Sequence, residues 1–314
     1  MATASTANAE AGGGTPPPPD TVEITSCQLC GSGERTLKFT DGPFRVFTCR
    51  CGLVYVTPRL SGQALRDVYD ASYWQSANPK TRGYADYASE AELYLKTFRK
   101  RMALVSRWLP PRARVLDVGC AAGYFLRVAR EHGHDVHGCE LSAAIATHAV
   151  RELGGERIHV GLLDEAVAAK GWAQQSFDLV TAWDVIEHVP DPQALLRQMR
   201  ALIKPGGRLL LETQNVASRW ARVLGKRWHH YKHDEHLYHF SPDTLRALLR
   251  NCGFRELAMT SRFAGKYVSF GFLAERAGRF GGVAALLAKP LALLRAANFY
   301  VNPQDELIVV AEPA

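Results

Sequence analysis

Hydrophobic and polar positions alternate in blocks from Arg114 onward, and the blocks have two lengths. Short apolar runs of strand length are separated by longer stretches in which apolar residues recur every three or four positions. This alternation predicts an α/β fold with a mostly parallel, helix-covered sheet, because helices carry the chain between parallel strands. The expected strands are Arg114–Val118, 135–139, Ile158–Val160, Phe177–Trp183, 208–213 and 307–310, and the expected helices are Tyr124–Glu131, Ala143–Leu153, 193–203 and 244–251.

Local signals mark several helix ends. Asp191 precedes Pro192, and Ser241 precedes Pro242, so each pair places a capping side chain before a proline suited to the first helical turn. Gly253 follows the last residue of the 244–251 helix and predicts its end.

The residues before this pattern divide into three parts. Residues 1–24 are rich in Ala, Gly, Thr and Pro and predict a disordered tail. Residues 25–60 contain two cysteine pairs and predict a small module, which precedes the main domain at 109–314. The pattern in residues 61–108 predicts helices at 64–69 and 88–108. This segment either forms a lid over the substrate or only packs against the main domain. Their aromatic residues include Tyr69, Tyr73, Trp74, Tyr84 and Tyr87.

Beyond the main pattern, residues 269–299 are rich in Ala and Leu and predict two packed helices. A peripheral membrane contact there is an alternative to packing.

Composition narrows the function classes. Hydrophobic residues make up 47% of the 314 residues and charged residues 22%, as in soluble globular proteins. The net charge of +7 is not gathered into a basic run with interleaved aromatics, which disfavours a nucleic-acid partner. The sequence shows neither a signal peptide nor an apolar run of membrane-spanning length, so we expect a cytoplasmic protein with reduced thiols. Composition leaves the oligomeric state open.

Four of the 7 cysteines form a pair-plus-pair pattern. Cys27 and Cys30 are spaced C-x-x-C, and Cys49 and Cys51 follow about 20 residues later as C-x-C. Four thiolates on two tight turns are the donor set of a structural zinc ribbon. The second pair is one residue shorter than the usual knuckle, so unliganded buried thiols remain an alternative.

A glycine-containing turn follows the first strand of the main domain. Gly119 and Gly123 lie after Asp117. Glu140 ends the second strand, 23 residues after Asp117. Such glycines allow a ligand to approach the backbone, and a strand-end carboxylate can accept both hydroxyls of a ribose. By themselves these features also suit a nicotinamide dinucleotide.

Several motifs in order extend this picture: VLDVGCAAGYFL, GCELS, FDLVTAWDVIEHVPDP, LIKPGGRLLLETQN and HLYHFSPDTLRALLRNCGF. Over 114–253 the chain resembles class I S-adenosylmethionine-dependent methyltransferases, most closely the subgroup with ubiquinone-biosynthesis O-methyltransferases and many sugar or polyketide methyltransferases. The resemblance implies a Rossmann-like, seven-stranded, doubly wound sheet. It also implies S-adenosylmethionine as the cofactor.

The resemblance also implies residue roles. Asp117, Gly119, Ala121 and Gly123 would line the methionine part, with Ala121 standing where the family usually has glycine. Glu140 would hold the ribose. Leu163 and Asp164, in a loop after the third strand, would flank the adenine, and Trp183 and Asp184 would lie beside the sulfonium.

Candidate chemistry gathers in two places. Asp184, Glu187 and His188 follow the fourth strand as D-x-x-E-H, and 5 of the 11 histidines, including His236, fall within residues 229–239. Histidine and carboxylate together suit a divalent cation. Plant-type small-RNA 2′-O-methyltransferases resemble this arrangement.

Three interpretations stay open at this point. Asp184, Glu187, His188 and His236 hold a second divalent metal; His188 or His236 is a metal-free general base, with Glu187 beside it; or the cluster only orders the loop.

The function that follows is O-methylation of a small-molecule or glycan hydroxyl, on a sugar, a quinone-like phenol or a polyketide. The alternatives are C-methylation of a nucleotide-linked deoxysugar, and a non-catalytic binding protein with a vestigial cofactor domain.

Overall fold

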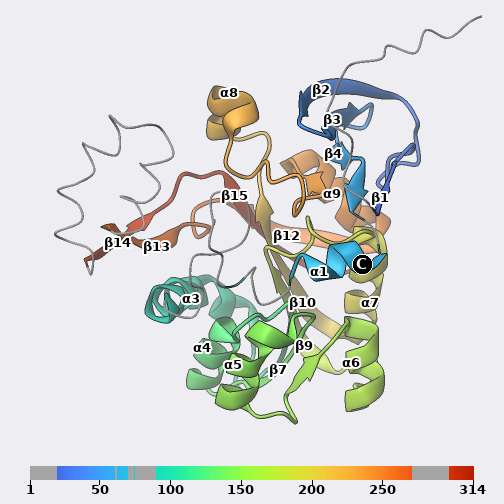
Figure 1. The fold of residues 1–314 in the computed structure, drawn as a ribbon. Coiled ribbons are helices and arrows are strands. Elements are labelled where there is room, and N and C mark those ends of the chain that lie inside the picture. Colours follow the sequence, from blue (N-terminus) through green and yellow to red (C-terminus); the bar gives the residue numbers. More distant parts are fainter. Residues whose placement is uncertain (1–19, 61, 70–73, 75–89, 271–296) are drawn as a thin grey trace, which may run out of the picture.

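The computed structural model describes residues 20–60, 62–69, 74, 90–270 and 297–314 (Figure 1). The tail expected at 1–24 lies almost wholly outside these residues, as do Tyr73, Tyr84 and Tyr87.

A seven-stranded sheet forms the centre of the molecule, as the family resemblance implies, and it includes a strand at 254–260 that the hydrophobic pattern did not predict. All its strands run parallel except the last in sequence, which pairs antiparallel with both of its neighbours. The order across the sheet is β12 (Phe254–Thr260), β15 (Glu306–Pro313), β10 (Ile203–Gln214), β9 (Phe177–Trp183), β6 (Arg114–Val118), β7 (Asp135–Glu140) and β8 (Ile158–Val160).

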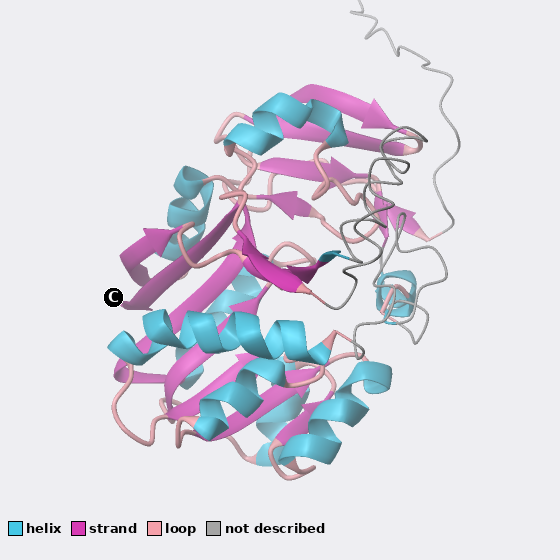
Figure 2. Ribbon diagram, turned by 90° about the vertical axis from the view of Figure 1, so that its left-hand side faces the viewer, coloured by secondary structure: helices cyan, strands magenta, loops and turns pink. Residues whose placement is uncertain are grey.

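Helices cover the sheet on two faces, so the fold has three layers (Figures 1 and 2). One face carries α3 (Ala91–Val105), α4 (Tyr124–Glu131) and α5 (Ala143–Leu153), and the other carries α6 (Leu163–Lys170), α7 (Pro192–Leu202) and α9 (Pro242–Asn251). Each interlayer space is filled by its own apolar cluster of buried residues. The central strands read as near-continuous hydrophobic runs because both of their faces are buried.

The predicted helix starts are confirmed by their caps. The Asp191 carboxylate accepts a hydrogen bond from the Ala194 amide at 2.9 Å, and the Ser241 hydroxyl accepts one from the Thr244 amide. Both helices begin with the expected proline.

A second sheet joins the N-terminal module to the main domain. It has the order β11 (Tyr238–His239), β4 (Val54–Thr57), β3 (Phe44–Cys49) and β2 (Arg35–Asp41), and a short pair joins β1 (Thr21–Val22) to β5 (Arg59–Leu60). Tyr238 pairs with Tyr55 and His239 with Val54, so the histidine-rich segment is the edge strand of the cysteine module's sheet. The sequence gives no sign of this pairing, because β11 contains only two residues.

The ends of the Ala- and Leu-rich region differ from expectation. Lys266–Ser269 (β13) pairs antiparallel with Asn298–Val301 (β14), so both ends of the predicted 269–299 helices are strands. The residues between them, and the membrane contact considered there, lie outside the described part.

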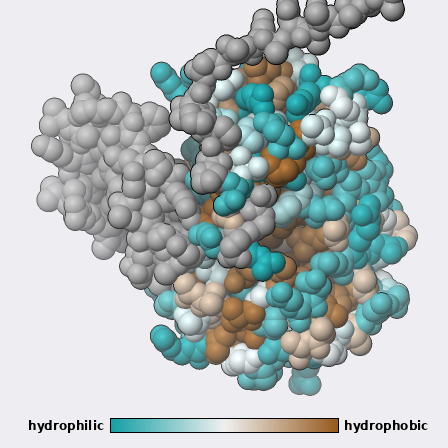
Figure 3. All heavy atoms as spheres, turned by 45° about the vertical axis from the view of Figure 1, so that its right-hand side comes forward, coloured by the Kyte–Doolittle hydropathy of each residue, from teal (hydrophilic) through white to brown (hydrophobic). Residues whose placement is uncertain are grey.

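The remaining short elements are helices α1 (Gly62–Asp67), η1 (Ser106–Trp108), α8 (Arg219–Leu224) and η2 (Gly225–Arg227). Among the described residues, no helix is long and apolar enough to cross a bilayer. The face in Figure 3 is largely hydrophilic, with apolar side chains gathered in patches.

Candidate functional site

The turn between β6 and α4 is built to let a ligand approach the backbone. Gly119 has a φ of +73°, and a Cβ there would lie 2.6 Å from Val185 Cγ2, so only glycine fits. Ala121 has a φ of +47°, the left-handed region that costs most residues about 1–2 kcal/mol. Glycine adopts this conformation without that cost, in line with the glycine that the family resemblance leads us to expect at this position.

Two buried carboxyl groups face this turn from adjacent strands. Asp117 is the penultimate residue of β6, and its carboxyl group accepts a hydrogen bond from the Thr181 hydroxyl at 2.6 Å. Glu140, the last residue of β7, accepts from the amides of Ala121 at 3.0 Å and Ser142 at 2.8 Å. Burial raises the pKa of Asp117 to about 8, with a smaller contribution from the Glu140 charge, and burial also raises the pKa of Glu140. The side-chain hydrogen bonds seen at these two carboxyl groups among the described residues come from neutral donors, so the pair can receive a ligand with an ammonium group and ribose hydroxyls.

The other residues expected at the cofactor lie around the same edge. Leu163 and Asp164 form the first turn of α6 rather than a loop, and the Glu165 carboxylate accepts a hydrogen bond from the Leu162 amide at 2.8 Å at the start of this helix. The Trp183 ring packs among Phe98 and Phe125 in the core and is 9% exposed.

An aromatic residue from the segment ahead of the main domain reaches this edge. Trp74 Nε1 donates to the Ser142 hydroxyl at 2.8 Å, directly beside the Glu140 carboxylate.

The D-x-x-E-H segment and the histidine-rich segment meet beyond the end of β9. The Glu187 carbonyl accepts hydrogen bonds from the amides of Leu237 (2.9 Å) and Tyr238 (3.3 Å). The Glu187 carboxyl accepts from the Thr213 hydroxyl at 3.0 Å. These contacts bring Glu187, His188 and His236 together, with one potential ligand atom from each within 4.8 Å of the others.

Backbone carbonyls orient both imidazole rings. His188 Nδ1 donates to the Glu235 carbonyl at 3.0 Å, and His236 Nδ1 donates to the His230 carbonyl at 2.7 Å. Because Nδ1 then carries the proton, Nε2 of each ring keeps its lone pair for a proton or a metal ion. Burial lowers the pKa of both histidines, that of His236 well below its ordinary value, so both rings are neutral near pH 7.

The lid-or-packing segment also reaches this pair. The Tyr69 hydroxyl lies 2.8 Å from His188 Nδ1. Tyr69 and Trp74 therefore contact the candidate catalytic histidine and the cofactor turn respectively.

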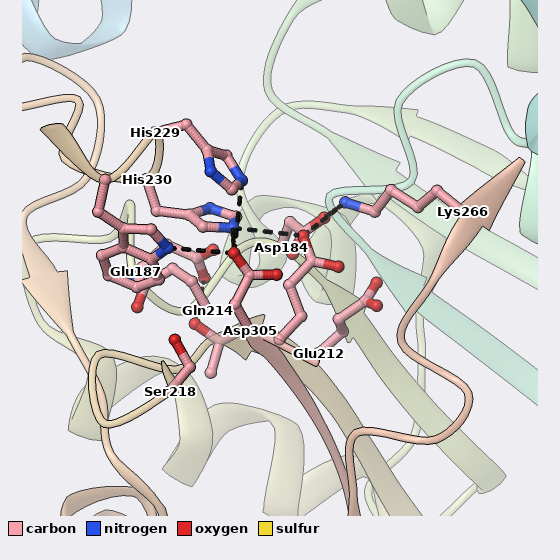
Figure 4. A network of polar contacts seen from close by, with 12 residues as sticks. Asp184, Glu187, Glu212, Gln214, Ser218, His229, His230, Lys266 and Asp305 are labelled. Carbon is pink, nitrogen blue, oxygen red and sulfur yellow. Dashed lines mark hydrogen bonds and ion pairs between the residues drawn. The ribbon is translucent and has the colours of Figure 1, made fainter. Parts of the chain in front are cut away.

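Asp184 points away from this trio, toward a lysine (Figure 4). Lys266 Nζ lies 3.0 Å from the Asp184 carboxylate and 2.9 Å from that of Glu306. Although burial opposes ionisation, Lys266 and then Arg101 hold the pKa of Asp184 below its ordinary value. The metal-ligand group that the structure forms contains Glu187, His188 and His236 without Asp184.

A buried ion pair lies beneath the lysine. Arg101 of α3 makes two hydrogen bonds to the Glu212 carboxylate, at 2.6 and 2.5 Å, and the two side chains are 2% and 0% exposed. The guanidinium also faces the Trp183 ring at 5.1 Å, which connects this polar core to the cofactor side.

Sequence reasoning missed Arg101, Glu212, Lys266 and Glu306. None lies in a recognisable spacing, and they come from four elements that meet only in the folded chain. Only Glu212 and Glu306 carry a local signal, since each is a charged residue beside an apolar run of β10 or β15.

The four cysteines form a compact cluster. The sulfur of Cys27 lies 3.7 Å from that of Cys51, and the sulfur of Cys30 lies 3.5 Å from that of Cys49. All four thiols are free, and their sulfurs lie within 4.8 Å of one another. Two ligands on a tetrahedral zinc ion with Zn–S bonds of about 2.3 Å lie about 3.8 Å apart, so the spacing fits that ion.

Side chains of the main domain hold the first cysteine knuckle in place. Gln193 of α7 donates to the Gln28 carbonyl at 2.6 Å, and Asn251 of α9 donates to the Leu29 carbonyl at 3.0 Å.

Comparisons with known proteins agree with this geometry. A family model described as "Methyltransferase domain" matches residues 87–258. A ubiquinone biosynthesis O-methyltransferase of Xanthomonas axonopodis pv. citri is 35% identical over 168 residues, which are 49% of this chain and 68% of that protein. The protein of the same name from Coxiella burnetii (strain Dugway 5J108-111) is 34% identical over 101 residues, which are 32% of this chain and 43% of that protein.

A solved structure was also compared. A SAM-dependent methyltransferase from Archaeoglobus fulgidus is 18% identical, with a TM-score of 0.47, over 72% of this chain and 98% of that one. On the strength of the family model and the curated relatives, the chain belongs to the class I S-adenosylmethionine-dependent methyltransferases.

Proposed function

We propose that this enzyme methylates a hydroxyl group of a small molecule or glycan, with the acceptor held beside Glu187, His188 and His236. The observation that carries the proposal is the convergence of these three side chains, with both rings oriented by backbone carbonyls. Glu187 and His188 follow β9, at the carboxyl edge of the sheet where ligands of such folds bind, and His236 joins them from the segment before β11. The curated relatives are named as O-methyltransferases, which supports the same reaction.

The cofactor side would bind and align the methyl donor. Asp117 offers a carboxylate to the ammonium group, and Glu140 offers one to the ribose hydroxyls. The turn at Gly119 lets the donor lie against the backbone. Because the sulfonium is already activated, the protein's main work is to align the acceptor and remove its proton.

His188 would take the acceptor proton at Nε2. Its Nδ1–H is engaged by the Glu235 carbonyl, and burial keeps the ring neutral, which is the form a base requires. Tyr69 would close over the ring from the preceding segment.

The same trio fits a divalent cation, because two imidazoles and a carboxyl group are suitable donors and both rings have their other nitrogen satisfied. Glu187, His188 and His236 would hold it. A cation bound there would lower the pKa of the acceptor hydroxyl. We include Asp184 in this ligand set only if its side chain leaves Lys266.

Methyl transfer from radiolabelled S-adenosylmethionine tests the proposal. Catechol-type phenols, sugars and polyketide hydroxyls are supplied in parallel, with and without a chelator. With the wild-type enzyme, we expect the label in an oxygen-linked methyl group. In His188→Ala, we expect the transfer rate to fall below about 1% of the wild-type rate, as when a general base is lost. Label in a carbon-linked methyl group would instead support deoxysugar C-methylation. Absence of binding to S-adenosylhomocysteine would support the non-catalytic alternative.

We further propose that Cys27, Cys30, Cys49 and Cys51 bind a structural zinc ion and that residues 25–60 form the corresponding module. Zinc content measured before and after Cys27→Ser tests this. A chain that keeps its zinc after the substitution contradicts the proposal. We expect the enzyme in the cytoplasm, where the thiols stay reduced.

A further inference from the structure

A second group of histidines lies beside the candidate catalytic trio and uses none of its side chains. His229, His230 and Asp305 each place a potential ligand atom within 4.8 Å of the others. The two histidines lie a few residues before His236, whereas Asp305 directly precedes β15, about 75 residues later in the chain. Figure 4 shows both rings directed at the same carboxylate.

We propose that His229, His230 and Asp305 bind a divalent transition-metal ion at a site distinct from Glu187, His188 and His236. Two imidazoles and one carboxylate suit zinc, cobalt, nickel and iron better than magnesium or calcium, which prefer oxygen ligands. This inference goes beyond the proposed function, since it does not depend on which acceptor is methylated.

The distances match ligands that share one ion. Nε2 of His229 and Nε2 of His230 each lie 3.6 Å from the same oxygen of Asp305. This separation is too long for a hydrogen bond. It is close to the separation of about 3.4 Å between two ligands on a tetrahedral ion with bonds near 2.1 Å.

One nitrogen in the cluster has no hydrogen-bond partner. His230 Nε2 is buried and makes no hydrogen bond within the described residues. Leaving a buried polar atom unpaired costs about 1–3 kcal/mol, so native proteins usually satisfy it. A metal ion placed between the three side chains would satisfy this atom.

The Asp305 carboxylate is held as metal ligands commonly are. Trp228 Nε1 donates to it at 3.1 Å, and the Asp305 carbonyl accepts from the Asn215 amide at 2.7 Å. Asp305 is 2% exposed, so its position is fixed by these contacts rather than by solvent. Such outer hydrogen bonds orient a ligand and tune its affinity for the ion.

The surrounding charge also favours a cation. In this polar region, Lys266 forms ion pairs with Asp184 and Glu306, and Arg101 forms one with Glu212. Five carboxyl groups lie around these two positive side chains. Glu306 adds to the metal cluster itself, because its carboxylate lies 3.8 Å from His230 Nε2. The carboxyl groups are Asp184, Glu187, Glu212, Asp305 and Glu306.

Cobalt titration of the metal-stripped full chain tests the site. Calorimetry and elemental analysis count the bound ions, and tryptophan fluorescence reports on this site because the Trp228 ring centroid lies 4.9 Å from that of His230. The variant is His229→Ala, chosen because that side chain is 42% exposed and its loss spares the core. The matched control is His148→Ala on α5.

We expect His229→Ala to lose one cobalt ion per chain, or to bind it at least about 10-fold more weakly, and to lose the accompanying fluorescence quenching. His148→Ala and His188→Ala should keep that ion and that quenching. His188→Ala should affect only the ion of the neighbouring trio, so failure of the proposed function and failure of this site give different results. Equal cobalt stoichiometry, affinity and quenching in wild type and His229→Ala would overturn the proposal.

Discussion

The two halves of the site are constructed differently. On the cofactor side, Asp117, Gly119 and Glu140 lie within 24 residues of sequence and meet through one strand–turn–helix unit and its neighbouring strand. On the acceptor side, Glu187, His236 and Asp305 come from separate segments and meet only when β15 and β11 have taken their places. The first half depends on local backbone conformation, and the second depends on the whole topology.

This difference implies that the two halves fail separately. A change at the cofactor turn should alter donor binding, and a change in the polar region should alter transfer, metal content or stability. Each prediction below tests that separation.

The largest expected effect is on catalysis. His188→Ala removes the imidazole that we propose as the general base, so kcat should fall about 10²–10⁴-fold, while the Kd for S-adenosylhomocysteine stays within experimental error. Initial rates and calorimetry measure the two quantities. His148→Ala is the control. Loss of donor affinity in His188→Ala would show that the two halves are coupled.

The next effect is on stability. Arg101→Met leaves the Glu212 carboxyl buried without its partner, which should lower the free energy of unfolding by about 3–5 kcal/mol. Adding Glu212→Leu removes the orphaned group and should restore most of the loss, as measured by urea denaturation. A double variant no more stable than Arg101→Met would contradict the assigned cause.

At the cofactor side, the affinity for S-adenosylhomocysteine is expected to change by up to about tenfold per pH unit. With a pKa of about 8, Asp117 is protonated at lower pH and must lose its proton to bind an ammonium group. Affinity for S-adenosylhomocysteine should therefore rise from pH 6 to about pH 8 and then level off. Asp117→Asn should bind weakly with a flat profile in calorimetric titrations, and a sloping profile in that variant would assign the effect elsewhere.

The same raised pKa fixes the sign of a stability effect in the cofactor-free chain. The folded state holds the Asp117 proton more tightly than the unfolded chain, where the carboxyl has a pKa near its ordinary value. Stability is therefore lost as pH rises from about 4 to about 8. Asp117→Asn should remove this part of the pH dependence.

The smallest effect is expected at the cofactor turn. Ala121→Gly removes the strain of an alanine in the left-handed region, but the glycine also increases the conformational entropy of the unfolded chain. The free energy of unfolding should therefore rise by about 0.5–1 kcal/mol. Thermal unfolding measures it. A lower melting temperature in the variant would mean that contacts of the Ala121 methyl group outweigh the strain.

The elements and site residues that the sequence predicts are those that depend on local sequence, and those it does not predict depend on the pairing of distant segments. Strands β6, β8 and β9 and helices α4 and α5 begin and end at the predicted residues, because each is a short periodic segment bounded by turn residues. The single antiparallel strand and the pairing of β11 with β4 could not be predicted, since register between distant segments leaves no local signal. For the same reason Glu187, His188 and His236 were recognised by their residue types, whereas Lys266 and Glu212 were not.

The place of β15 in the sheet has a consequence for how the protein is made. This strand is synthesised after all the others, yet it lies between β10 and β12 and brings Asp305 and Glu306 to the polar region. Before β15 is in place, β10 has an unpaired edge, and Lys266 lacks the Glu306 carboxylate. The cofactor turn can close on the nascent chain, but the acceptor side is assembled only after residues 305–313 emerge. An open strand edge can pair with another chain, so folding intermediates that lack β15 are the species expected to aggregate.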